Sequence, residues 1–411
     1  MSQNHGPDRG PLDVSREIGV LEVGRNLLLV SSSSAIGLGC VAAFWLMGAL
    51  IASKDVVGQI SFVISVSTVF SGTAQLGFGL GKLAIFPKDN RGKILLQFDA
   101  IVGLVSMAAI AALWGLKLNL VTYGPIVLGQ VSFSMVTYDL LARKEYATAS
   151  LLTIVCRTLQ LAVGLASLWA GHSPETIALA YAAPLLITSP VFGRSVFGGL
   201  KLRKRPNLRM DGNLLGNLSG IAVLRTLIGY LDKVIVAFVL GYVVLGEYQF
   251  VFQVFLLAQF FPSSVLLYLV PERSSGSIGK SLLAIPMLGA FGTAVLAIVV
   301  ASVALNTFLP AYSNTLMALV VVSTTIIPAT AASFLASELM TSGGTKSLLR
   351  SYLLSFCSQY LALLTLTAVA GLEGVAGSLL VGQTVLLMAS GFAVKNARKK
   401  KARDLSMQEQ I

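Results

Sequence analysis

The chain has 411 residues, of which 55% are hydrophobic and only 12% are charged, and its mean hydropathy is +0.80. Soluble domains carry about 25% charged residues, so this composition excludes a soluble globular protein and indicates a membrane protein with many crossings. The net charge of +12 does not indicate nucleic-acid binding, because the basic residues gather in short loops and in the C-terminal tail, a pattern that sets membrane topology.

Hydrophobic stretches that are long enough to cross a bilayer recur along the whole chain. A membrane helix needs about 20 consecutive, mainly apolar residues. The stretch before Arg25 is polar or mixed, and no cleavage pattern closely follows the first apolar run, so that run is interpreted as a membrane helix and not as a secretory signal. The sequence predicts twelve membrane helices, at residues 27–53, 57–85, 94–116, 118–141, 147–171, 175–198, 214–240, 246–270, 281–308, 314–340, 351–372 and 374–394.

Lysine and arginine are distributed very unevenly over the predicted connections. With the N-terminus placed inside, the inner loops and tails carry 23 of the 30 basic residues, whereas the outer turns carry only Lys54 and Lys117. Loops that stay on the cytoplasmic side of a membrane are enriched in Lys and Arg. The sequence therefore predicts that both termini are cytoplasmic and that the number of crossings is even.

The longest internal polar stretch lies between the sixth and seventh predicted helices and divides the chain into two halves. The predicted organisation is a cytoplasmic N-terminal tail (1–26), an N-terminal six-helix bundle (27–198), a basic cytoplasmic linker (199–213), a C-terminal six-helix bundle (214–394) and a basic cytoplasmic tail (395–411).

A short internal repeat supports this division. VVGQISF (Val56–Phe62) begins the second predicted helix, and VLGEYQF (Val244–Phe250) begins the eighth, so the same pattern recurs at the same place in each half. Both copies run from the outside to the inside, so the two halves are predicted to be parallel repeats related by a pseudo-two-fold axis along the membrane normal.

Several charged residues lie inside predicted membrane helices, where each costs about 2.5–3.5 kcal/mol on insertion scales unless it faces a partner or a water-filled cavity. Arg225 and Asp232 are seven residues apart and so share one helix face, and Lys233 follows directly. Arg157 is the matching candidate in the N-terminal half. These residues either bind an anionic ligand, with Asp232 balancing charge or carrying a proton, or form ion pairs that only hold helices together.

Other charges lie near the predicted inner ends of helices. Arg25 is either a topology-setting charge or an entry-site residue at the inner mouth of the first helix. Lys82 and Arg194 are best explained by side chains that extend toward the aqueous interface. Asp99 and Asp139 either pair with such bases, or one of them acts as a coupling carboxylate.

Motifs typical of enzymes are absent from the sequence. There is no HExxH, no P-loop and no GxSxG, and the three cysteines show no metal-binding spacing. The sequence therefore predicts a transporter and not an enzyme, with no cofactor and no metal. Gln249, Gln253 and Gln259 are candidates for contacts with sugar hydroxyls, or they link helices by hydrogen bonds.

At these positions the chain resembles the polysaccharide-export (Wzx-type) flippases of the MOP superfamily, relatives of the MATE exporters and of the peptidoglycan-precursor flippases. The strongest match is YLDKVIVAFVLGYVVLGEYQFVFQV (Tyr230–Val254), with an Asp, a hydrophobic stretch that ends in Leu-Gly, and a Gly-x-Tyr that begins the next helix. VVGQISFVISV (Val56–Val66) and LGFGLGKLAIF (Leu76–Phe86) fit the second helix of that family.

The resemblance implies an all-α membrane fold of about twelve helices in two six-helix bundles with a V-shaped cavity between them. It implies alternating access that moves a polyprenyl-diphosphate-linked oligosaccharide from the inner to the outer leaflet for surface polysaccharide biosynthesis. Membrane lipids, a polysaccharide polymerase and export machinery are the implied partners. The residues available to receive the pyrophosphate are Arg225, Arg157, Lys233 and Arg25, and those available for coupling or charge balance are Asp232, Asp139 and Asp99.

Two other functions are compatible with a polytopic membrane protein. A MATE-like, ion-coupled exporter of organic cations predicts a cavity dominated by acidic residues. A membrane-embedded polymerase or ligase for glycans predicts a long outer loop, and the sequence offers only short outer turns.

Overall fold

The computed structural model describes residues 11–79, 82, 92–201, 212–274, 284–341 and 344–408. For parts of these ranges only the backbone course is described, namely residues 11–28, 30–31, 92–95, 212–215, 259–274, 284–286, 341 and 400–408. Within the described ranges every regular element is a helix, as the predicted all-α fold requires.

The N-terminal half contains α1 (Pro11–Ile51), α2 (Lys54–Gln75), α4 (Gly92–Gly115), α5 (Leu120–Ala142), α6 (Tyr146–Trp169), α7 (Pro174–Ala182), the 3₁₀ helix η1 (Ala183–Thr188) and α8 (Ser189–Leu200). The C-terminal half contains α9 (Gly212–Ser274), α10 (Ala284–Thr307), the 3₁₀ helix η3 (Pro310–Thr315), α11 (Leu316–Thr324), α12 (Ile326–Thr341) and α13 (Thr345–Gln408).

In the described part of the chain, ten helical stretches are long and apolar enough to cross a membrane. Two of them each contain one glycine with non-helical backbone angles, Gly241 in α9 (φ 83°) and Gly371 in α13 (φ 53°). A positive φ is readily adopted only by glycine. Division of these two stretches at the glycines gives twelve crossings. Gly241 lies in the predicted turn after residue 240, and Gly371 lies two residues before the predicted turn at residue 373.

Three helix boundaries differ from the predicted membrane segments. The second helix ends at Gln75 and not near residue 85, because Leu76 (φ 47°) and Gly77 (φ 66°) take left-handed backbone angles that end the helix. At the other extreme, α1 already begins at Pro11, and α13 continues to Gln408, so both run into the predicted tails. Hydropathy marks the part of a helix that lies in the membrane and not the full extent of the helix.

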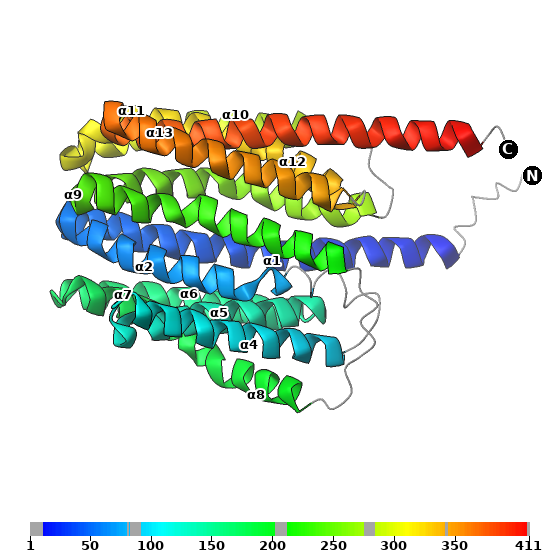
Figure 1. Cartoon of the computed structure of the whole chain (residues 1–411), viewed down its shortest axis with the longest axis horizontal. Coiled ribbons are helices and arrows are strands. Elements are labelled where there is room, and N and C mark those ends of the chain that lie inside the picture. Colours follow the sequence, from blue (N-terminus) through cyan, green and yellow to red (C-terminus); the bar gives the residue numbers. More distant parts are fainter. Residues whose placement is uncertain are drawn as a thin grey trace, which may run out of the picture.

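The helices run roughly along one common direction (Figure 1). Helices α4 to α8 lie on one side, α10 to α13 lie on the other, and α1, α2 and α9 lie between them. The chain extensions of α1 and α13 project from the same end of the bundle, which we call the terminal end. The opposite end, where α1 passes into α2 and where α9 and α13 bend at their glycines, we call the distal end.

Each half has its own apolar core. In the N-terminal half the ring of Phe44 stacks on that of Tyr181 at a centroid distance of 4.3 Å, among buried side chains of α2, α5 and α7. A second cluster fills the space between α9, α10, α11 and α13. Many large apolar side chains point outward, among them Phe291 and Leu296 on α10, which are 60% and 61% exposed. A multi-pass membrane protein places such side chains against lipid.

The internal repeat brings equivalent residues together at the distal end. A methyl group added at Gly58 would lie 1.8 Å from the backbone oxygen of Tyr242, and one added at Gly246 would lie 2.1 Å from that of Lys54. These are reciprocal contacts, since the repeat aligns Gly58 with Gly246 and Lys54 with Tyr242. Reciprocity of this kind is what a two-fold relationship produces. We call this contact of α2 with the second part of α9 the distal crossing.

Candidate functional site: a cationic central cavity

A cavity of about 500 Å³ lies between the two halves. Its described wall is formed by α1, α2, α5, α6, α7, η1 and α9. Ligand sites in proteins typically measure about 300–1,000 Å³, so this space has the size of a small-molecule site. Hydroxyl and amide side chains contribute much of the wall, among them Ser61, Thr68, Ser71, Gln130, Gln249 and Gln253.

The cavity extends toward the terminal end and is closed at the distal end. Its wall includes Gly77 and Gly79 just past the end of α2, and Tyr138 near the end of α5. At the distal end, the close backbone contacts at Gly58 and Gly246 pack α2 directly against α9. Lys54 Nζ and Glu247 Oε1 form an ion pair of 2.5 Å across the same crossing.

Glu247 has a second partner at the distal crossing, since Asn314 Nδ2 of η3 donates to the same carboxylate oxygen at 2.9 Å. Lys54 Nζ also lies 5.0 Å from the centre of the Tyr312 ring. The sequence alone does not reveal this role of Glu247, because Lys54 and Asn314 come from other elements, α2 and η3.

Three cationic side chains line the cavity, namely Arg157, Arg225 and Lys233, and no Asp or Glu is among the described residues of its wall. The structure thus brings together three of the four predicted substrate-binding residues. The fourth, Arg25, lies in α1, but its side chain falls outside the described residues. The same is true of Gln259, whereas Gln249 and Gln253 do line the cavity.

Arg157 is fixed by neutral neighbours. Its Nη1 donates to Gln160 Oε1 at 2.8 Å, and its guanidinium carbon lies 5.1 Å from the centre of the Phe133 ring of α5. Its side-chain stem passes α1 at Gly37, where an added methyl group would lie 3.3 Å from Arg157 Cγ. The side chain is therefore positioned by α1, α5 and α6 together.

Arg225 differs from Arg157 in its surroundings. It is an exposed side chain on the first part of α9, beside Ala222 and Thr226 of the cavity wall. No ion pair joins either arginine to a carboxylate in the described part of the chain. Within the described residues, each arginine therefore carries an uncompensated positive charge, one from each half of the molecule.

Lys233 is a third and different case, because it is buried, with 1% exposed surface. Its Nζ donates to the Gly229 carbonyl at 2.7 Å and lies 3.6 Å from Asp232 Oδ1. The ammonium group also lies 3.4 Å from the centre of the Phe252 ring. An ammonium group over an aromatic face is stabilised by the ring quadrupole.

Asp232 belongs to the same buried cluster and is not part of the described cavity wall. Tyr248 donates its hydroxyl hydrogen to Asp232 Oδ2 at 2.5 Å. From α13, Gln359 and Tyr360 donate to the backbone oxygens of Ile228 and Leu227, which fixes this part of α9. The predicted pairing of Asp232 with a base is thus made with Lys233, its neighbour in sequence, and not with Arg225.

Asp99 and Asp139 lie in an ion cluster within the N-terminal half, outside the described cavity wall. Lys82 Nζ is 2.8 Å from Asp99 Oδ1 and 3.7 Å from Asp139 Oδ1, and Arg143 pairs with Asp139 at 2.9 Å. Lys82 is completely buried, so it does not extend toward the interface as the sequence suggests. The cluster ties the chain beyond the break in α2 to α4 and α5.

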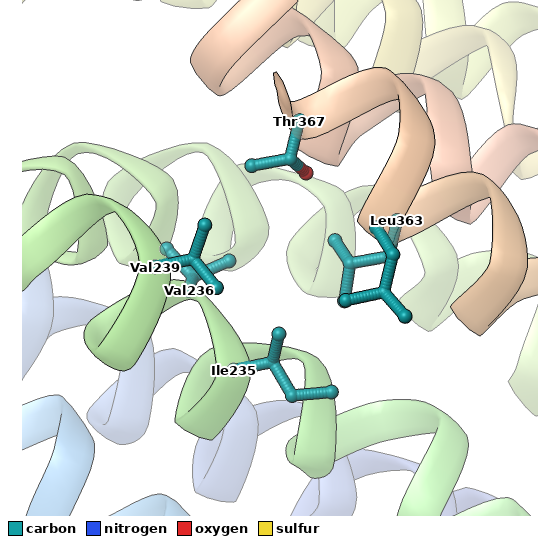
Figure 2. A pocket seen from close by; sticks show the side chains of 6 residues that line it. Ile235, Val236, Val239, Leu363 and Thr367 are labelled. Carbon is teal, nitrogen blue, oxygen red and sulfur yellow. The ribbon is translucent and has the colours of Figure 1, made fainter.

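A much smaller cleft lies between α9 and α13 (Figure 2). It has a volume of about 10 Å³ and is lined by Ile235, Val236, Val239, Leu363, Leu364 and Thr367. A volume of that size holds at most one water molecule, so this cleft is too small to be a ligand site.

The sequence analysis missed a hydrogen-bonded cluster of polar side chains between α2 and α5, formed by Thr68, Ser71 and Gln130. Ser71 Oγ donates to Gln130 Oε1 at 2.6 Å, and Gln130 Nε2 donates to Thr68 Oγ1 at 3.0 Å. Gln130 is the only glutamine in the fourth predicted helix and lies near its middle. A polar side chain at the centre of an apolar membrane helix is a signal that could have identified it.

No protein-family model matches the sequence. No curated protein matches it either. Solved structures do resemble it. The lipid II flippase MurJ in an inward closed conformation aligns with a TM-score of 0.66 at 12% identity, over 90% of this chain and 87% of that chain. The MATE multidrug transporter DinF-BH aligns with a TM-score of 0.64 at 12% identity, over 91% and 96%.

A third similar structure is an outward-facing multidrug resistance MATE transporter of the MOP superfamily, with a TM-score of 0.59 at 12% identity, over 92% of this chain and 97% of that chain. The chain has a MOP-type fold. The three alignments span nearly all of each MOP structure, so the likeness concerns the whole architecture and not one bundle. At such low identity the likeness shows the fold alone, so what the chain binds has to be argued from its cavity.

Proposed function

We propose that the protein is a membrane transporter that moves a polyprenyl-diphosphate-linked oligosaccharide across the cytoplasmic membrane by alternating access, in a surface-polysaccharide pathway. The observation that carries this proposal is the charge of the central cavity. Arg157, Arg225 and Lys233 line it, and the described wall contains no carboxylate. Such a cavity attracts an anion and repels a cation.

The chemistry of the wall fits a sugar diphosphate. The planar guanidinium of arginine can bond two oxygens of one phosphate at once, which makes it well suited to a diphosphate. The amide and hydroxyl side chains, such as Gln130 and Gln253, offer donors and acceptors that match sugar hydroxyls. The lipid tail of such a cargo stays in the bilayer, so only the head group needs the 500 Å³ space.

The rival proposal is a MATE-like exporter of small organic cations. It needs carboxylates that face the cargo. Asp99, Asp139 and Asp232 instead pair with Lys82, Arg143 and Lys233. Both kinds of transporter are among the similar structures, one a lipid II flippase and one a multidrug transporter, so cavity charge is the feature that favours the lipid-linked cargo.

Direction and coupling complete the proposal. The terminal end is assigned to the cytoplasm, because the predicted inner connections carry 23 basic residues and the outer turns carry two. The cavity then extends toward the cytoplasm and is closed on the outside by the distal crossing. For ion coupling, we favour Asp232 over Asp99 and Asp139, because its partner Lys233 lines the cavity.

The test uses a deletion strain in which lipid-linked oligosaccharide and surface polysaccharide are measured together. The proposal predicts that the complete repeat unit accumulates on its carrier while surface polymer is lost. Unchanged polysaccharide together with sensitivity to cationic drugs would reject the proposal in favour of the MATE-like exporter.

Complementation of that strain tests the cavity itself. Arg157→Ala and Arg225→Ala should abolish export while the protein still inserts at normal abundance. Arg350→Ala is the matched control, because Arg350 is an exposed arginine outside the described cavity wall, and it should restore export fully. Normal export by both cavity variants would contradict the assignment.

A further inference from the structure

Gln160 lies where its amide can fix a cavity arginine without cancelling its charge. It is buried, with 2% of its surface exposed, and it lies on α6 one turn beyond Arg157. Its Oε1 accepts a hydrogen bond from Arg157 Nη1 at 2.8 Å. A glutamate has nearly the same shape as glutamine but would form an ion pair at this distance, which would use the positive charge that an anionic cargo needs.

The other contacts of Arg157 are neutral as well. The Phe133 ring supports the guanidinium group at 5.1 Å, and Gly37 leaves just enough room for the side-chain stem. An arginine held in this way loses little conformational freedom when it binds, and preorganised groups bind more tightly for that reason. Arg225 likewise has no ion-pair partner in the described part of the chain. It differs from Arg157 because its side chain is exposed.

We propose that Gln160 is a positioning and specificity-determining residue, which acts through Arg157 to keep one fixed and uncompensated positive charge at the anion-binding part of the cavity. This inference rests on the proposed function, because it assumes that an anion binds there. In this arrangement Arg157 is the fixed contact for the diphosphate, and Arg225 is the adaptable one from the opposite half.

The experiment measures binding of inorganic pyrophosphate to the purified full-length protein by calorimetry. Arg157→Ala should weaken binding about tenfold or more, as expected for loss of a hydrogen-bonded charge. Gln160→Leu should weaken it about three- to tenfold through lost orientation. Gln160→Glu, which keeps the side-chain shape, should weaken it at least as much as Arg157→Ala.

A double-mutant cycle separates positioning from a general structural role. If Gln160 acts through Arg157, Gln160→Leu has no further effect once Arg157 is alanine. Gln130→Leu is the matched control, since Gln130 is another cavity amide whose hydrogen bonds go to Ser71 and Thr68. Gln130→Leu should change the pyrophosphate affinity by the same factor whether residue 157 is arginine or alanine.

The outcomes distinguish this inference from the proposed function. Equal effects of Gln160→Leu with and without Arg157, or unchanged pyrophosphate binding by Gln160→Glu, would overturn the positioning role while the anion site stands. If the wild-type protein binds no pyrophosphate, the proposed function and the inference fail together. Should Gln160→Leu not fold, the isosteric Gln160→Glu variant decides the question.

Discussion

Ser61 and Gln249 are equivalent residues of the two halves, and they hydrogen-bond to each other, Ser61 Oγ to Gln249 Oε1, at 3.0 Å. A residue that contacts its own equivalent lies beside the axis that relates the halves. One helical turn toward the distal end, Gly58 and Gly246 make their reciprocal backbone contacts. The pseudo-two-fold axis therefore passes between α2 and the second part of α9, through the distal crossing.

The first prediction concerns the glycines of the distal crossing. Gly58→Ala places a methyl group 1.8 Å from the Tyr242 oxygen, so the two helices must separate. Overpacking of this kind costs about 1–3 kcal/mol. We expect a lower melting temperature for Gly58→Ala and for Gly246→Ala. In Gly48→Ala, the control, an added methyl group meets nothing within 4 Å, and a melting temperature that fell equally there would contradict the explanation.

The second prediction concerns the Lys54–Glu247 ion pair. Its side chains are 23% and 8% exposed, so the loss of one partner leaves a poorly solvated charge and costs about 1–3 kcal/mol. Cysteines placed at positions 61 and 249, in a background without the native cysteines, report closure through a short thiol crosslinker. Lys54→Met and Glu247→Gln should each lower the crosslinking yield.

A charge-swapped variant provides the control for this pair. Lys54→Glu with Glu247→Lys restores the attraction and should crosslink better than either single variant. Equal crosslinking in all variants would mean that the glycine contacts alone hold the crossing closed.

The third prediction separates structural from coupling carboxylates. Asp99→Ala leaves the fully buried Lys82 with the more distant Asp139 and the Met135 carbonyl, and removal of one partner of a buried ion pair destabilises a protein by about 3–5 kcal/mol. Low abundance and a low melting temperature should result. Arg143→Ala should have a small effect, because the Arg143 side chain is 44% exposed. A stable Asp99→Ala protein with lost transport would instead indicate a coupling role.

The fourth prediction concerns the buried cluster around Asp232. Tyr248→Phe removes the hydroxyl that donates to Asp232 Oδ2, and a buried acceptor that loses its partner costs about 1–3 kcal/mol. We expect a lower melting temperature with the cavity arginines still functional, so pyrophosphate binding should persist. The same drop in an Asp232→Leu background, which lacks the side-chain acceptor, would show that the hydroxyl acts elsewhere.

The fold was predictable because the insertion of a membrane helix is driven mainly by the transfer of apolar side chains into the bilayer, which hydropathy measures. The breaks in α9 and α13 were expected near Gly241 and Gly371, because the hydrophobic pattern divides there into two membrane helices and glycine readily adopts a positive φ. The early end of α2 at Gln75 was not predictable, because the apolar run continues past Leu76 and only the backbone angles show where the helix stops.

The site was predictable in part. A charged side chain inside a membrane helix is costly unless it faces a partner or a water-filled cavity. That argument drew attention to Arg157, Arg225 and Lys233, which all line the cavity. Partners on other helices cannot be read from spacing. The sequence allowed Asp99 and Asp139 to pair with a nearby base, and the structure confirms this with Lys82. The Lys54–Glu247 pair emerges only when α2 is packed against α9.

The cavity wall does not share the symmetry of the crossing. Seven elements form its described wall, and of these only α9 comes from the C-terminal half. The duplication is thus retained at the distal crossing and lost in the cavity wall. Under the proposed function, substitutions in α5 and α6 would change the cavity wall without touching the distal crossing, so variants designed for a different cargo belong on those two helices.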